Sequence, residues 1–208
     1  LGPPRVIVVP NGWHRIDAHG VRIDTVEPWR HVPDLSLEQW LVRKPVFMGA
    51  MLMRREWIDR AGGFDPTLAQ GEDLKLVLHM VALGCRGAWV HAPTVCYRQH
   101  PASLTRNRVQ MLTCSNRVVA EFFARNDLPA HIRALEDEVG FGTLVWSAWQ
   151  LHRDGNTTDV AAFLRESRAY DRGESVAKVI QRWLHGLFYN SLQDGCALTE
   201  VHAFWPHI

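Results

Sequence analysis

The spacing of apolar and polar residues changes near residue 106 and divides the chain into two parts. Short apolar runs and alternating segments before this point predict strands, whereas apolar residues after it recur at helical spacing to about residue 192. Turn-forming residues interrupt the helical pattern at 127–129, 154–156 and 172–173. We therefore expect an α/β portion at 1–106 and an all-α helical extension at 107–208, made of three or four packed helices.

The strand-like segments of the first part are short and bounded by turn residues. They are 5–10, the two arms of a hairpin at 13–17 and 21–25, an apolar run at 46–53, and the pair 87–91 and 94–99 on either side of Pro93. The hairpin turn is predicted at 17–20, where Asp-Ala-His-Gly supplies turn-forming residues. Strands that alternate with helical segments predict an α/β fold for this part.

Three helices are expected between these strands. A capping box at Ser36 and Gln39 begins a helix that ends near residue 42, and a second short helix spans 54–61. Apolar residues at helical spacing in 74–81 predict a third helix, which ends at Gly84. Two adjacent carboxylates, Glu72 and Asp73, therefore lie in the first turn of the third helix.

Composition excludes some classes of protein. The 208 residues are 47% apolar and 22% charged with a net charge of +1, which is typical of a globular protein and gives no electrostatic case for a nucleic-acid binder. No apolar run is long enough to cross a membrane and no secretory signal pattern is present, so we expect a cytoplasmic protein, with a membrane-peripheral location as the alternative. The first residue is Leu1, which indicates a processed, excerpted or tagged chain.

Cysteine and tryptophan allow few specific conclusions. Cys85, Cys96, Cys114 and Cys196 lack C-x-x-C spacing, so they predict free thiols and no zinc or redox site. The nine tryptophans are expected in the core or in an interface, and stacking of one or two of them on sugar is the alternative. The sequence also lacks the nucleophile elbow, the P-loop and the Rossmann glycine fingerprint, which counts against a hydrolase, an NTPase and a dehydrogenase.

Two polar stretches carry candidate chemistry. At the start of a helix, exposed N–H groups and the helix dipole favour an ionised carboxylate, the form that a general base needs, so Asp73 is a candidate base beside Glu72. Ordinary helix capping is the alternative. Arg98 and His100 lie at the end of a predicted strand, where a guanidinium suits phosphate and an imidazole suits a divalent metal. A surface salt bridge and a solvated histidine are their alternatives.

Four short motifs occur in a fixed order between residues 47 and 105. They are Phe47-Met48-Gly49-Ala50, Ala61-Gly62-Gly63-Phe64-Asp65, Gly71-Glu72-Asp73-Leu74 and Tyr97-Arg98-Gln99-His100-Pro101. Their order and spacing resemble the second half of a family 2 glycosyltransferase with the GT-A fold, over about residues 5–106. The resemblance implies inverting transfer of a sugar from a nucleotide-diphospho sugar to a saccharide, a lipid-linked sugar or a protein.

The resemblance also implies roles for individual residues. Asp73 would be the catalytic base, and Glu72 would shape the acceptor site. His100 would complete the coordination of Mn²⁺ or Mg²⁺. The residues implied to contact donor or acceptor are Gly49 and Ala50 in the sugar pocket, Gly71 before the acidic pair, and Arg98 and Arg106 near the diphosphate. Close packing of backbone is the alternative role for Gly49 and Ala50.

The chain departs from the family's pattern at several positions. Lys75 stands where the family often has an acidic or aromatic residue, and His79 stands where it often has arginine. No Asp-x-Asp occurs in the 208 residues, so the main metal carboxylates and the nucleotide pocket must come from elsewhere or be absent. The alternative function is therefore a non-catalytic remnant or a partner subunit that binds or scaffolds. In both cases we expect a homodimer or a partner chain to cover the open sheet edge.

Overall fold

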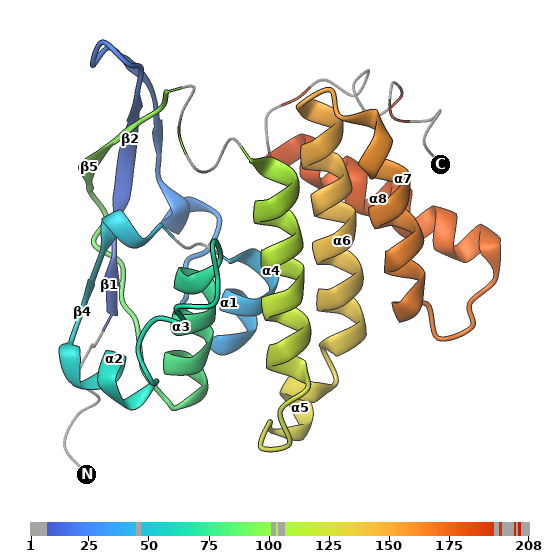
Figure 1. Cartoon of the computed structure of the whole chain (residues 1–208), viewed down its shortest axis with the longest axis horizontal. Helices are drawn as coiled ribbons and strands as arrows, with labels where there is room; N and C mark the ends of the chain where they lie inside the picture. The colour runs from blue at the N-terminus through green and yellow to red at the C-terminus, as the bar shows by residue number, and fades with distance from the viewer. Residues whose placement is uncertain are drawn as a thin grey trace. The chain divides into compact units, whose positions relative to one another are not determined.

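The structure is a computed structural model that describes residues 8–44, 47–100, 103, 107–193, 196, 202 and 204. Residue contacts divide the chain into two compact units, Leu1–Leu128 and Pro129–Ile208. Strands and helices occur in the first unit and helices in the second, so the expected mixture of α and β structure is confirmed (Figure 1). Among the described residues, no helix is both long and apolar enough to span a membrane.

The strands of the first unit form two small sheets. Strands β1 (Val8–Pro10) and β4 (Met51–Met53) pair antiparallel. The other sheet has the order β3-β2-β5, in which β2 (Gly12–Ile16) pairs antiparallel with β3 (Arg22–Val26) and parallel with β5 (Pro93–Arg98). The predicted hairpin is therefore confirmed, and one mixed sheet joins it to a strand from much later in the chain.

A carboxylate organises the hairpin turn, as the turn residues predicted. Asp17 Oδ1 accepts hydrogen bonds from the backbone N–H groups of His19 and Val21, both at 2.8 Å. The backbone N–H of Asp17 donates to the carbonyl of Val21 at 2.9 Å, just beyond the last pair of the ladder, Ile16 and Arg22.

The apolar run at 46–53 is not one strand. Val46 lies outside the described residues, and Met48–Ala50 forms a single 3₁₀ turn before β4 begins at Met51. The turn forms because the N–H of Ala50 bonds to the carbonyl of Phe47 at 2.9 Å, which leaves the ladder with three residues only. A continuous apolar run did not distinguish a strand from a turn followed by a short strand.

The strand predicted at 87–91 is also wrong. The N–H of Ala92 bonds to the carbonyl of Val90 at 2.8 Å and closes a tight three-residue turn just before β5. The indole N–H of Trp89 donates to the carbonyl of Val32 at 2.7 Å, so this side chain is held by a loop and not by a neighbouring strand.

Helices α1 (Leu37–Arg43), α2 (Arg55–Arg60) and α3 (Glu72–Ala82) lie close to the predicted ranges. The hydroxyl oxygen of Ser36 caps α1 by accepting from the N–H of Gln39 at 3.3 Å, as the capping-box pattern predicted. Helix α3 packs against α1, against α2 and against α4 (Arg108–Phe123). Figure 1 shows α3 between the strands and α4.

The pattern change at 106 coincides with the start of α4, yet the compact units divide between Leu128 and Pro129. The reason is that α4 packs against α3, so its apolar face completes the first unit.

The predicted breaks at 154–156 and 172–173 lie within the second unit, which consists of helices. Its elements are α5 (Ala130–Arg133), α6 (Glu136–Arg153), α7 (Thr157–Ser167), a 3₁₀ turn at Arg168–Tyr170, and α8 (Val176–Gln193). The breaks at 127–129, 154–156 and 172–173 all fall between helices.

One cysteine, Cys85, and three of the described tryptophans are buried. All four cysteines are free, and burial raises the pKa of the Cys85 thiol to about 11. Trp40 and Trp149 are fully buried, and Trp183 is buried with its indole N–H donating to Ser167 Oγ at 2.8 Å. These three tryptophans pack in the interior and are not available to stack on a sugar.

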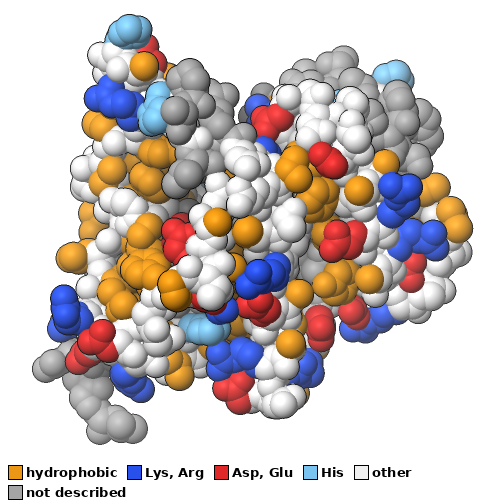
Figure 2. Space-filling view, in the orientation of Figure 1, with side chains coloured by type: hydrophobic (Ala, Val, Ile, Leu, Met, Phe, Trp, Pro, Cys, Tyr) orange, Lys and Arg blue, Asp and Glu red, His pale blue; other side chains and the backbone are white. Residues whose placement is uncertain are grey.

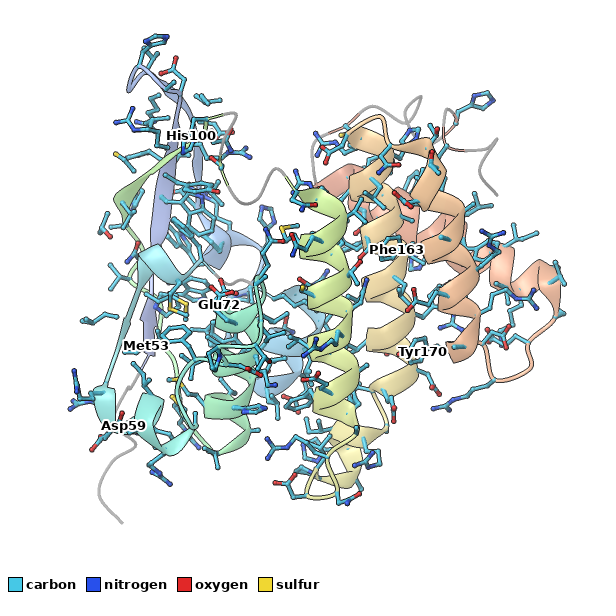
Figure 3. The ribbon with its side chains drawn as sticks, viewed as in Figure 1. Met53, Asp59, Glu72, His100, Phe163 and Tyr170 are labelled. Carbon is cyan, nitrogen blue, oxygen red and sulfur yellow. The ribbon has the colours of Figure 1, made fainter. Side chains whose placement is uncertain are left out.

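Two glycines of α6 differ sharply in what surrounds them. A Cβ at Gly140 would lie 2.5 Å from Cζ of Tyr170, whereas a Cβ at Gly142 would meet nothing within 4 Å. The ring of Tyr170, labelled in Figure 3, therefore packs directly on the helix backbone at Gly140.

We expect Gly140→Ala to lower the free energy of unfolding by about 1–2 kcal/mol. The steric clash of the added methyl group with Tyr170 costs more than the gain in helix propensity contributes. Gly142→Ala is the matched control on the same helix and should raise that free energy by about 0.5–1 kcal/mol. Urea denaturation followed by circular dichroism measures both. Equal changes in the two variants would show that the Tyr170 contact is not tight.

Candidate functional site

The acidic pair lies at the start of α3, where the backbone makes a sharp turn. Gly71 is the residue before the helix and has a φ of 80°, a left-handed conformation that costs a glycine little. Its carbonyl accepts the first helical hydrogen bond, from the N–H of Lys75 at 3.0 Å. A Cβ at Gly71 would meet Cys114 and Ser115 of α4 at 3.7 Å, so this end of α3 packs beside the middle of α4.

Asp73 is half-buried, and its environment raises the pKa of its carboxyl above the ordinary value of 3.8. Burial is the main cause, and the charge of Glu72 adds to it. A hydrogen bond from the N–H of Leu74 to Oδ1, at 2.7 Å, acts in the opposite direction. We expected the helix terminus to favour the charged form, but the cost of burying that form is larger here.

A network of charged side chains fixes the segment before the acidic pair. Lys75 Nζ lies 2.7 Å from Asp65 Oδ2 and 2.9 Å from Glu121 Oε2, and Arg117 Nε lies 2.7 Å from Glu121 Oε1. Asp65 also accepts hydrogen bonds from the backbone N–H and the hydroxyl of Thr67. Lys75 therefore joins the loop that follows α2 to both α3 and α4.

These contacts explain the pKa directions in the network. The ammonium group of Lys75 and the two hydrogen bonds from Thr67 hold the pKa of Asp65 well below its usual range. Hydrogen bonds from Arg117 and Lys75 lower the pKa of Glu121. The pKa of Lys75 is raised by Asp65 first and by Glu121 second.

His79, the other departure from the family pattern, is half-buried on α3. Burial lowers its pKa, and the positive charge of Arg125 lowers it further. The guanidinium of Arg125 binds the carboxylate of Asp127 at 2.9 and 2.7 Å. His79 thus faces the end of α4, in an environment that favours the neutral imidazole.

Gly49 and Ala50 lie in the 3₁₀ turn before β4. Ala50 is buried, and its carbonyl accepts from the N–H of Asn11 at 2.9 Å, which is a packing role. Gly49 is exposed, and a Cβ there would lie 3.1 Å from the ring of Phe47. That ring packs on Tyr97 of β5, with 4.8 Å between ring centroids, so Gly49 is brought near β5.

Arg98 and His100 lie at the end of β5, and both are exposed. Arg98 Nη1 donates to the backbone carbonyls of Asp17 and Ala18, at 3.2 and 2.9 Å, and so holds the hairpin turn. His100 forms a short turn with Ser103 through bonds of 3.3 and 3.1 Å. Arg106 lies outside the described residues.

The structure therefore places the predicted site residues in separate groups. Figure 3 shows Glu72 at the start of α3 and His100 at the end of β5, apart from each other. In the part of the chain that the structure describes, no three His, Cys, Asp or Glu side chains are grouped so that they could hold a metal ion. The described residues alone therefore do not fit a Mn²⁺ or Mg²⁺ site.

The network around Lys75 is the feature that the sequence did not predict. Lys75 lies between the buried residues Leu74 and Leu76 of α3, which signals that its ammonium group needs a partner. One partner, Glu121, is 46 residues away, and only the packing of α3 on α4 brings the two together.

Comparisons with family models, with curated proteins and with solved structures found no match to this chain.

We expect Lys75→Met to lower the urea midpoint at pH 7, because Asp65 and Glu121 lose the cation that they share. Both carboxyls have a pKa below the ordinary values of 3.8 and 4.5. Their stabilisation is therefore present above those values and is lost as the pH falls through the lowered folded values. The difference in urea midpoint between the wild type and Lys75→Met should therefore become smaller as the pH falls from 7 toward 3.

Lys178→Met is the control, because Lys178 Nζ lies 2.9 Å from Oε1 of Glu174, which precedes α8, and the Lys178 side chain is 63% exposed. Its effect on the urea midpoint should be smaller, as for other exposed pairs. An unchanged midpoint for Lys75→Met at pH 7 would show that the network does not stabilise the fold.

Proposed function

We propose that this chain carries the acceptor-side catalytic part of an inverting glycosyltransferase, with Asp73 as the general base. One observation carries the proposal: Asp73 is a half-buried carboxylate with a raised pKa, and it lies at a helix start directly after a left-handed glycine. Groups with shifted pKa values are enriched at catalytic sites. The order of motifs from Phe47 to Pro101 supplies the reaction class, through resemblance to family 2 glycosyltransferases.

The raised pKa suits the chemistry of the proposed step. The acceptor hydroxyl forms a bond to the anomeric carbon while the bond from that carbon to the diphosphate oxygen breaks. The proton of the hydroxyl passes to Asp73, and the leaving nucleoside diphosphate takes the bonding electrons. A base with a pKa closer to neutrality accepts this proton more readily than an ordinary aspartate.

Glu72 has a different role in the proposal. Its charge raises the pKa of Asp73, so adjacent carboxylates in one helical turn are not equivalent. Glu72 shapes the acceptor site and helps to keep Asp73 a stronger base. Gly71 supplies the left-handed residue that turns the chain into α3 and so places the acidic pair in its first turn.

The donor in this proposal is a nucleotide-diphospho sugar, and the acceptor is a saccharide, a lipid-linked sugar or a protein. Arg98, His100 and Arg106 are donor-side candidates through the family resemblance. Arg98 already donates to hairpin carbonyls through Nη1, so its contact with a diphosphate would use its remaining N–H groups. No step of the proposed reaction runs through a metal ion.

We expect Asp73→Asn to reduce sugar transfer by ~10²–10⁴-fold, because an amide cannot accept the proton. Release of nucleoside diphosphate from a panel of nucleotide sugars, with candidate acceptors, measures transfer by this chain. For the wild type, the rate should rise with pH through a value above 3.8, where Asp73 becomes ionised. Activity of Asp73→Asn within about threefold of wild type would remove Asp73 from the base role.

The stability of the same variant gives an independent reading. Because folding raises the pKa of Asp73, its charge at pH 7 opposes folding, and Asp73→Asn should leave the thermal midpoint unchanged or raise it. Glu72→Gln is the matched control and should reduce transfer less than Asp73→Asn does. A lower thermal midpoint for Asp73→Asn would indicate that this carboxylate is a structural helix cap, which is the alternative role that the sequence analysis gave.

A further inference from the structure

The hairpin of β2 and β3 exposes apolar side chains at its turn. Val21 is 64% exposed and Ile23 is 55% exposed, and the residues from Ala18 to Ile23 are all exposed. Figure 1 shows this turn at the end of the sheet, away from α2 and α3. Val21 and Ile23, on either side of Arg22, are both β-branched, and such side chains normally pack on a sheet face.

Basic side chains flank these apolar residues. Arg22 donates to the hydroxyl of Thr25, and Arg98 donates to the carbonyls of Asp17 and Ala18. Neither guanidinium forms a salt bridge with a carboxylate among the described residues. Figure 2 shows apolar, basic, acidic and histidine side chains together at this end of the molecule.

Acidic charge near the turn is mostly compensated. Asp24 is held by both Nε and Nη2 of Arg15, and the two charges neutralise each other. Asp17 accepts from the backbone of its own turn. With Arg15 and Asp24 cancelled, Arg22 and Arg98 outweigh Asp17, so the end of the hairpin is basic.

The outer edge of β3 is poorly shaped for pairing with another strand. Arg15 lies opposite Asp24 and Ile16 lies opposite Arg22, so Ile23 is an extra residue in a β-bulge. A bulge bends and twists an edge strand, and natural proteins use it to prevent edge-to-edge pairing. This geometry disfavours a second copy that would extend the sheet at β3.

We propose that the turn of the β2–β3 hairpin docks on an anionic lipid surface. Val21 and Ile23 enter the boundary between headgroups and acyl chains, and Arg22 and Arg98 lie at the level of the lipid phosphates. Apolar insertion combined with basic attraction is the usual basis of peripheral membrane binding. This proposal does not depend on the proposed sugar transfer, and its test involves no enzymatic activity.

The test is sedimentation of the full 208-residue chain with vesicles of phosphatidylcholine, with and without phosphatidylglycerol. We expect binding to the vesicles that contain phosphatidylglycerol and weaker binding at high salt. The double variant Val21→Ser, Ile23→Ser should bind at least about tenfold more weakly, because it loses two inserted apolar side chains. Arg22→Gln should also weaken binding to anionic vesicles.

Leu52→Ser is the matched control, because Leu52 is 73% exposed on β4, away from the hairpin. It should bind vesicles as the wild type does. Circular dichroism and thermal midpoints establish that each variant is folded. Absence of wild-type binding, or equal loss of binding in Leu52→Ser, would overturn the proposal. Self-association of the chain that the hairpin variants abolish, without lipid binding, would overturn it in favour of a second copy.

Discussion

The first unit depends on the burial of α3, a helix that is apolar around most of its circumference. Its buried residues are Leu74, Leu76, Val77, Leu78, Met80 and Val81. Such a helix is stable only when other elements cover several of its sides. Helices α1, α2 and α4 do so, and methionines from β4 and the preceding turn pack against Leu76 and Met80. Flexible methionine side chains suit this role, because they fill irregular space between the sheet and the helices.

The same packing determines the chemistry at the start of the helix. Because α3 is enclosed, a carboxylate in its first turn loses water, and the pKa of Asp73 rises even though the helix terminus favours the charge. Polar residues farther along α3 must find partners for the same reason. Lys75 binds Asp65 and Glu121. The environment of His79 lowers its pKa, which favours the neutral imidazole over the charged one. The burial that stabilises the unit thus also produces the candidate base.

At the other end of the first unit, hydrogen bonds from one arginine hold the hairpin turn. Arg98 at the end of β5 donates to the carbonyls of the hairpin turn, so this turn and Arg98 form one structural group. A residue that resemblance assigns to a diphosphate therefore already has a structural task. The same guanidinium also makes the end of the hairpin basic beside Val21 and Ile23, where the exposed apolar surface lies.

The sequence alone determined those features that local signals encode. The cap at Ser36, the turn at Asp17, the acidic first turn of α3 and the three breaks in the helical part were all predicted from a few neighbouring residues. The strands expected at 46–53 and 87–91 were wrong, because apolar content does not show whether a neighbouring strand will supply the ladder. The pairing of Lys75 with Glu121 and the direction of the Asp73 pKa shift were decided only by tertiary structure. The ion pair and the pKa shift both depend on which residues, distant in sequence, pack around the charged group. The residues next to that group in the sequence do not specify this packing.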